Sequence, residues 1–139
     1  MTAKEYLQQI YILQGRISRL QRLRSRIRDE MYSVSSPALD KDNVSASMSN
    51  PMERMIAKVD SIERDIVNEM LRLMDRRAFI CKQIEALEDE RYRKVLYERY
   101  IMYFKWEQIA TDLSYSLTQV YRLHGEALKA FAAQYGSKW

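Results

Sequence analysis

Apolar residues recur at steps of three and four along the first part of the chain. Between about Thr2 and Tyr32, alternating steps of this kind bring an apolar residue to the same side of a helix at almost every turn. Such a heptad stripe is typical of helices that pack against a partner as in a coiled coil. The stripe, in which Arg24 fills one position, consists of Ile10, Leu13, Ile17, Leu20, Ile27 and Met31.

A polar interruption follows, and after it comes a second stripe. The segment from Ser33 to Pro51 is rich in Ser, Asp and Asn and holds both prolines, so it predicts a mobile loop. Asn50 suits the N-cap of the next helix, and Pro51 suits its first position. The second stripe has one irregular step and Arg77 in one position; its apolar members are Met52, Met55, Val59, Ile62, Ile66, Met70, Leu73, Ile80, Ile84 and Leu87.

The two stripes predict an all-α fold that begins with a helical hairpin. The second helix would have about 37 residues and a length of roughly 55 Å, and such a helix needs a partner to cover its stripe. The first helix, folded back antiparallel, is the nearest partner, but it is shorter. The uncovered remainder could pair with a second copy of the chain. We therefore predict a coiled-coil-like hairpin over residues 1–88 and a homo-oligomer, with a dimer favoured.

The pattern changes at about Asp89, where the amino acids become more aromatic and the elements shorter. Residues 106–113 have apolar residues at helical spacing, and Ser116, after a short turn, is a good N-cap for a helix that begins at Leu117. These features predict a helix-turn-helix unit over residues 89–139. The inward face of its last helix should comprise Val120, Leu123, Ala127, Leu128 and Phe131.

The outward face of this last helix carries side chains that suit DNA. A recognition helix presents its N-terminal half to base edges in the major groove. Arg122 can bind guanine bidentately, Leu117 can touch a thymine methyl group, and the hydroxyl of Tyr121 can reach a phosphate. Lysines beside the helix can add phosphate contacts. The candidate DNA-binding residues are Leu117, Thr118, Gln119, Tyr121, Arg122, Lys105 and Lys129.

The charge of the chain is compatible with a nucleic-acid partner. The formal net charge is +4, and both ends are basic whereas the middle is slightly acidic. Six arginines crowd the first helix, and their spacing keeps them from sharing one face. They could be solvated while their stems cover apolar surface, or they could bind phosphates or an acidic partner. They are Arg16, Arg19, Arg22, Arg24, Arg26 and Arg28.

The segment from Tyr92 to Phe131 resembles region 4 of bacterial sigma-70 factors, the domain that reads promoter DNA. The resemblance rests on VLYERY, on WEQIATDLS and on the spaced residues S-x-x-x-V-x-x-L-x-x-x-A-L-x-x-F; nothing else in the chain looks like a sigma factor. The whole arrangement is similar to small phage-encoded regulators of the ArpU/RinA type. The resemblance implies that four residues read DNA, of which only the last is charged, whereas sigma factors favour charge at the first three. They are Leu117, Thr118, Tyr121 and Arg122.

These features together predict a sequence-specific DNA-binding transcription regulator, encoded by a phage or prophage. Its expected partners are double-stranded DNA and a second copy of the chain, with RNA polymerase as a further candidate. The expected location is the cytoplasm of the bacterial host, with no membrane contact, because no run approaches the roughly 20 apolar residues that span a bilayer. A phage small terminase subunit, used in DNA packaging, and a coiled-coil protein-interaction adaptor remain alternatives.

An enzyme is the least expected class of function. The single cysteine, Cys81, excludes an internal disulfide, and the single histidine, His124, cannot build a multi-histidine metal cluster. His124 lies beside the candidate DNA-binding face, but packing is a more usual fate for it than phosphate contact. The chain has no Gly-rich phosphate loop and no nucleophile motif. We therefore expect no catalytic residue, metal or cofactor.

Overall fold

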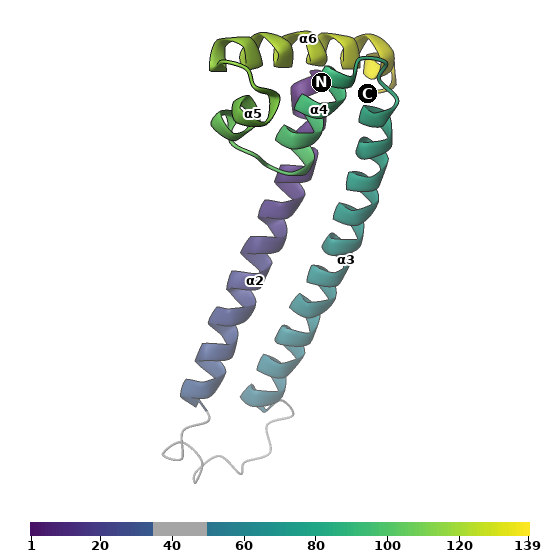
Figure 1. The fold of residues 1–139 in the computed structure, drawn as a ribbon. Helices are drawn as coiled ribbons and strands as arrows, with labels where there is room; N and C mark the ends of the chain where they lie inside the picture. The colour runs from purple at the N-terminus through teal and green to yellow at the C-terminus, as the bar shows by residue number, and fades with distance from the viewer. Residues whose placement is uncertain (35–49) are drawn as a thin grey trace. The chain divides into compact units, whose positions relative to one another are not determined.

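The computed structural model describes residues 1–34 and 50–139, and every regular element in these ranges is helical (Figure 1). The predicted all-α class is therefore confirmed. Most of the segment predicted as a loop, residues 35–49, lies outside the described residues, while Ser33 and Val34 still belong to a helix. The elements are α1 (Ala3–Leu7), α2 (Gln9–Val34), α3 (Pro51–Glu85), α4 (Glu90–Leu96), the π-helix η2 (Tyr97–Ile101), α5 (Trp106–Leu113), α6 (Leu117–Tyr135) and the short 3-10 helix η3 (Gly136–Lys138).

The chain divides into two compact units. One consists of residues 14–72, and the other of residues 1–13 together with residues 73–139. We call them the hairpin unit and the terminal unit, since the second contains both ends of the chain. The division does not follow the boundary between residues 88 and 89 that the sequence suggests. The reason is that the first helical turns pack with helices from the far end of the sequence.

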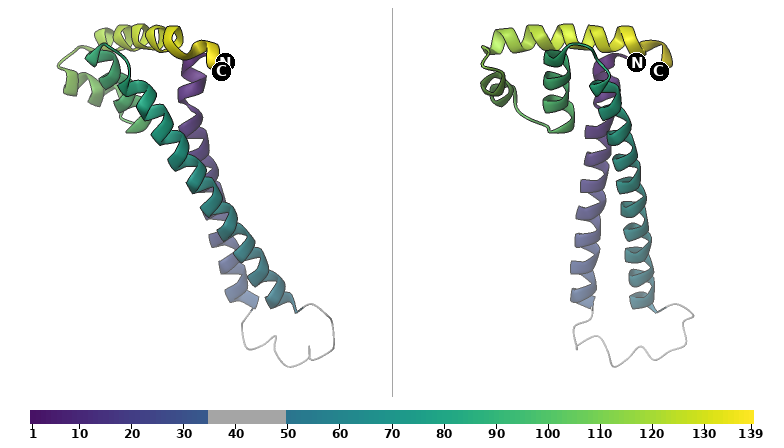
Figure 2. Two further views of the ribbon diagram at one scale, coloured as in Figure 1. Left: turned by 90° about the vertical axis from the view of Figure 1, so that its right-hand side faces the viewer. Right: turned by 45° about the vertical axis from the view of Figure 1, so that its right-hand side comes forward.

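The hairpin unit consists of antiparallel stretches of α2 and α3 that lie side by side in Figures 1 and 2. Ile17 from α2 is buried in this unit, as are Val59, Ile62 and Ile66 from α3. All four belong to the predicted stripes, because each stripe lies on the side of its helix that the other helix covers. Burial of these apolar side chains is the main favourable contribution to the pairing.

Polar contacts accompany this apolar seam. Glu63 of α3 accepts hydrogen bonds from Arg24 at 3.1 Å and from Arg28 at 2.9 Å. Arg24 occupies the one polar position of the first stripe, so its charge meets a carboxylate across the seam. At the start of α3, the Oδ1 atom of Asn50 accepts a hydrogen bond from the amide of Met52 at 3.0 Å. The predicted N-cap is therefore confirmed.

The predicted stripe of α3 is wrong at Met70, whose side chain is 44% exposed. Two consecutive steps of four residues, from Ile62 to Ile66 and from Ile66 to Met70, each rotate the position by about 40° around the helix. The accumulated rotation moves Met70 out of the seam, and a step of three returns Leu73 to a buried position. Val67 and Leu71 are also exposed, so α3 carries apolar side chains that the described hairpin does not cover.

The terminal unit begins with α1, which is separated from α2 at Gln8. The single helix expected from about Thr2 to Tyr32 is thus divided. Thr2 and Glu5 form a capping box at its start: the Thr2 hydroxyl accepts from the Glu5 amide at 3.2 Å, and the Glu5 carboxylate accepts from the Thr2 amide at 2.7 Å. The short helix that results buries Tyr6 and Leu7.

An aromatic cluster joins the two ends of the chain within the terminal unit. The ring of Phe131, on α6, is fully buried and lies 5.9 Å from the ring of Tyr6 and 5.8 Å from that of Trp139. The Tyr6 hydroxyl donates a hydrogen bond to Oε1 of Gln83, on α3, at 2.8 Å. Of the predicted inward face of α6, Leu128 is only half-buried, while the fully or nearly fully buried residues are Val120, Leu123, Ala127 and Phe131.

Candidate nucleic-acid interface

Helices α5 and α6 are joined by a tight turn. Ser114 ends α5 in the left-handed conformation, with φ 58° and ψ 40°, and the amide of Tyr115 donates a hydrogen bond to the carbonyl of Ala110 at 2.9 Å. This arrangement satisfies a carbonyl at the end of α5 and redirects the chain within two residues. Ser116 then starts the next helix. The short turn predicted at this point is therefore confirmed.

Ser116 and Gln119 form a capping box at the start of α6. The Ser116 hydroxyl accepts from the Gln119 amide at 3.2 Å, and Oε1 of Gln119 accepts from the Ser116 amide at 2.8 Å. The side-chain oxygen of Gln119 is thus occupied within the protein, which leaves only its NH2 group to donate outward. The Ser-x-x-Gln spacing is a known capping signature, and it could have revealed this role from the sequence.

One exposed side of α6 carries three of the candidate residues. Arg122 and Lys129 lie four and eleven positions after Thr118, and steps of this size return to nearly the same side of a helix with 3.6 residues per turn. All three are exposed, whereas Val120 and Ala127, on the opposite side, are buried. Thr118 and Arg122 belong to the N-terminal half of α6, and Lys129 follows them along the same side.

Two further candidates lie on the flank of this side. Tyr121 is 50% exposed and Leu117 is 39% exposed. The ring of Tyr121 meets the ring of Trp106, on α5, edge to face at 5.4 Å between centroids. Lys105 directly precedes Trp106 as the N-cap residue of α5, so it belongs to the neighbouring helix rather than to the exposed side of α6. The structure therefore separates Lys105 from the other candidates by element.

The guanidinium of Arg122 is held only weakly within the chain. Its Nε lies 3.4 Å from Oε1 of Glu126, one turn later on α6, and the Arg122 side chain is 83% exposed. Ion pairs between exposed side chains contribute little to stability. The guanidinium therefore remains available to an external acceptor, and Glu126 limits the directions in which it extends.

Aromatic packing supports the flank of α6 from behind. The ring of Trp106 lies 4.7 Å from that of His124, on α6, and the guanidinium of Arg99 lies over the same Trp106 ring, 4.2 Å from its centroid. Arg99 also donates a hydrogen bond to the carbonyl of Phe104 at 3.0 Å. These contacts connect η2, α5 and α6, and they hold the ring against which Tyr121 packs.

His124 has a packing role. Burial lowers its pKa, the positive charges of Arg99 and Lys4 act in the same direction, and together they bring the pKa to about 4. Burial also raises the pKa of Tyr100 to about 12, so its hydroxyl keeps its proton. Tyr100 Oη and His124 Nε2 lie 2.7 Å apart. A neutral, hydrogen-bonded imidazole in this position connects η2 to α6 and carries no charge toward a phosphate.

The structure contains a buried carboxyl group that the sequence did not predict. Glu98, on η2, is 8% exposed, and its Oε2 has no hydrogen-bond partner among the described residues. Burial raises its pKa, the charge of Asp112 on α5 raises it further, and Lys94 acts in the opposite direction. Protonation of Glu98 therefore favours the folded state. This contribution is complete below the pKa of the unfolded state and is lost as the pH rises through the folded-state pKa.

We expect Glu98→Gln to raise the free energy of unfolding at neutral pH by on the order of 1 kcal/mol, because an amide places no charge in this site. The gain should shrink at mildly acidic pH, where Glu98 itself takes up a proton. Urea unfolding followed by tryptophan fluorescence at both pH values measures the difference. Glu88→Gln, at an exposed position near the start of α4, is the matched control. A gain that does not depend on pH would contradict this assignment.

The described residues show neither a metal site nor a membrane-spanning element. In residues 1–34 and 50–139, no group of three or more His, Cys, Asp or Glu side chains is placed to hold a metal ion. No helix in the same ranges is long and apolar enough to cross a membrane.

Burial raises the pKa of the Cys81 thiol, and Glu85 adds to this effect. The thiol therefore stays protonated at neutral pH.

Comparison with known proteins identifies one family. Residues 33–132 match the family described as "Protein of unknown function (DUF1492)". The matched segment contains α3, α5 and most of α6, which includes the half of α6 that carries the candidate residues. Neither the curated proteins nor the solved structures include a significant match to the chain. Because the matched segment covers most of its residues, this protein belongs to the DUF1492 family.

Proposed function

We propose that this protein is a sequence-specific DNA-binding transcription regulator, encoded by a phage or prophage and acting in the cytoplasm of the bacterial host. In this proposal α5 and α6 are the two helices of a helix-turn-helix, and the N-terminal half of α6 enters the major groove. Arg122 reads a guanine, Thr118 contacts a base or a phosphate, and Tyr121 and Lys129 bind the DNA backbone.

One observation carries the proposal. The N-terminal half of α6 exposes Thr118, Tyr121 and Arg122 on the sides that face away from the buried residues of the terminal unit. The tight turn and the capping box define where this half begins, and Trp106 of α5 supports Tyr121 from behind. A helix presented in this way has the length and free surface that major-groove contact requires. The resemblance of residues 92–131 to sigma region 4 supports the same assignment.

Gln119 and Lys105 have smaller roles in this proposal than Arg122 and Thr118. Gln119 caps α6, so we assign it at most a phosphate contact through its NH2 group. Lys105 stands at the start of α5 and not on α6, so we assign it a contact to a backbone phosphate. The reading of bases is thus left to Arg122, Thr118 and Leu117, with a single positive charge among them. Such a small set predicts modest affinity for one copy of the unit.

Self-association would compensate for modest affinity. Within the hairpin unit, α3 exposes Ile56, Val67, Met70 and Leu71. Exposed apolar residues grouped along a helix are typical of surfaces that bind another chain. We therefore retain the dimer in the proposal. A mass measurement in solution separates it from the DNA-packaging alternative, because a dimer favours a regulator and a ring of many copies favours a small terminase subunit.

The test begins with fragments selected from the source genome by the wild-type protein. For a selected duplex, we expect Arg122→Ala to remove about 1–3 kcal/mol of its preference over a scrambled duplex, because a bidentate contact to guanine is lost. Fluorescence anisotropy at fixed salt measures both affinities. Arg72→Ala removes another exposed arginine that pairs within its own helix, and it should leave the preference unchanged. Full preference retained by Arg122→Ala would count against α6 as the reading helix.

A further inference from the structure

The six arginines of α2 fall into two groups. Arg24 and Arg28 bind the same carboxylate, Glu63, across the hairpin. Their charges are therefore engaged in holding α2 to α3. The remaining arginines of this helix are exposed, and none of them has an ion pair with α3 among the described residues. They are Arg16, Arg19, Arg22 and Arg26.

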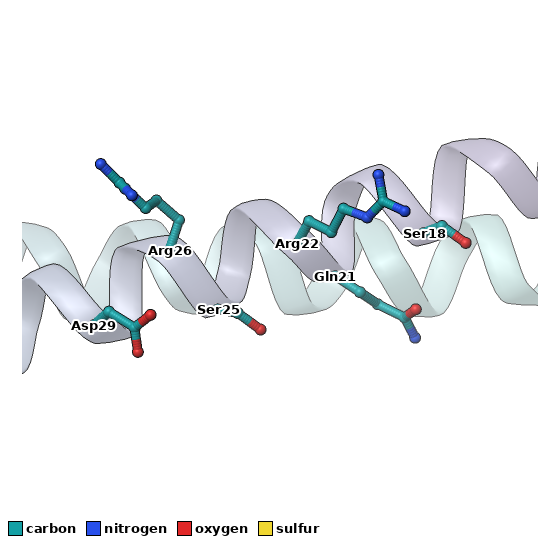
Figure 3. A pocket seen from close by; sticks show the side chains of 6 residues that line it. All are labelled: Ser18, Gln21, Arg22, Ser25, Arg26 and Asp29. Atoms are coloured by element: carbon teal, nitrogen blue, oxygen red, sulfur yellow. The ribbon is translucent and has the colours of Figure 1, made fainter.

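Three of these arginines lie on one side of α2, away from the seam. The steps from Arg19 to Arg22 and from Arg22 to Arg26 are three and four residues, which brings all three to one side over about 10 Å of helix. Only Arg26 has an ion-pair partner, Glu30, one turn further along, and this pair is exposed. Figure 3 shows Arg22 and Arg26 extending from α2 toward the same side. We call this side the arginine face.

Small polar residues line one edge of the arginine face. Ser18 and Ser25 line a shallow hollow together with Gln21, Arg22, Arg26 and Asp29 (Figure 3). The serine side chains are short, so the arginines are the outermost groups and a partner could approach the helix backbone closely. Hydroxyl and amide groups are also among the usual donors to phosphate oxygens. Asp29 would repel an anion, and it therefore marks the end of the face.

The chemistry of the arginine face favours a phosphate backbone over a protein. All cations of α2 are arginine and none is lysine, and the guanidinium fork matches the oxygens of a phosphate. A protein partner would need an apolar centre to bury. The residues that line the hollow offer none. Leu23, which lies four positions after Arg19 and three before Arg26, is an exposed apolar residue beside the arginine face, but a single leucine is too small to form such a centre.

We propose that the arginine face, defined by Arg19, Arg22 and Arg26, is a second DNA-contacting surface that binds the phosphates of a duplex irrespective of sequence. The identity of the polyanion rests on the function proposed above. The two surfaces have different tasks: α6 selects a sequence, and the arginine face adds affinity that every duplex receives. The positive charges of these three arginines would add the affinity for phosphates that the weakly charged exposed side of α6 lacks.

The test is the triple variant Arg19→Gln/Arg22→Gln/Arg26→Gln, with binding measured on the selected and the scrambled duplex over a range of salt concentrations. Glutamine has nearly the helix propensity of arginine, so unchanged helicity and melting are expected. Loss of three phosphate contacts should lower the slope of log affinity against log salt by about 2.7. Affinity in 0.1 M salt should fall on the order of hundredfold for both duplexes alike, and the preference should stay.

A matched control separates the arginine face from simple loss of charge. Arg54→Gln/Lys58→Gln/Arg64→Gln removes three exposed cations from α3, within the same hairpin unit. Its salt slope should change by less than about one. Equal losses in the two triple variants, or full affinity of the α2 variant, would overturn the inference.

The outcome for the inference is distinct from the outcome for the proposed function. If Arg122→Ala loses sequence preference while the α2 variant binds as well as wild type, only the proposal for the arginine face is wrong. The arginine face then contacts an acidic protein or solvent instead of DNA. If the wild-type chain binds no duplex even at low salt, both proposals are wrong.

Discussion

Replacing Phe131 by alanine should lower the free energy of unfolding of the terminal unit by about 3–5 kcal/mol. Phe131 is fully buried, and its ring contacts the rings of Tyr6, Tyr135 and Trp139 at centroid distances of 5.9, 5.0 and 5.8 Å. Removing it would leave a cavity among large rings, which cannot collapse into the space without losing their own contacts. A loss of this size is a large part of the stability of an ordinary domain.

Tryptophan fluorescence during urea unfolding is a suitable measurement, because both tryptophans of the chain, Trp106 and Trp139, belong to the terminal unit. The signal therefore reports on that unit even if the hairpin unfolds separately. Phe79→Ala makes the same chemical change at an exposed position of α3 in the same unit, and it should change stability by less than about 0.5 kcal/mol. Equal stability of the two variants would exclude Phe131 from the core.

Replacing Leu7 by alanine should lower the free energy of unfolding of the same unit by about 2–5 kcal/mol. Leu7 is fully buried, and with Tyr100 and Tyr103 it lines a hollow formed by α1, α2 and the segment around η2. Its neighbour Tyr6 contacts both Phe131 and Gln83. The first turns of the chain are thus part of the core on which α6 rests. A change at position 7 should therefore destabilise α6, which begins 110 residues later in the sequence.

The same fluorescence measurement detects this effect, and hydrogen exchange of the α6 amides shows where it acts. Leu23→Ala, at an exposed position of α2 in the hairpin unit, is the matched control and should leave the tryptophan transition unmoved. We expect the α6 amides of the Leu7→Ala variant to exchange faster than those of the wild type. A transition equal to that of wild type would mean that the start of the chain packs on the unit without stabilising it.

Much of the local structure could be predicted because it depends on residues a few positions apart. The N-caps at Asn50 and Ser116 follow from side chains that reach amides two or three residues away. The buried side of α6 follows from the spacing of Val120, Ala127 and Phe131. The candidate face of α6 is simply the other side of the same helix. No distant residue has to be known for any of these features.

Other features depend on which surfaces come together, and periodicity does not contain that information. Met70 has the spacing of a stripe residue, yet successive steps of four carry it away from the partner helix. Glu98 occurs in a charged stretch that suggests solvent, and it is buried because η2 packs near α5. Among the arginines of α2, only the presence of Glu63 on the opposite helix distinguishes Arg24 and Arg28 from those that form no ion pair with α3 in the described part of the chain.

The sequence by itself determined the all-α class, the two long amphipathic helices and the position of the exposed side of α6. Each is set by helical periodicity and by capping within a few residues. Only the tertiary structure decided that residues 1–13 belong with residues 73–139, that His124 is neutral and hydrogen-bonded, and that the arginines on one side of α2 form no ion pair with α3 among the described residues. These depend on burial and on charge pairing between segments far apart in sequence, and such contacts exist only once the chain has folded.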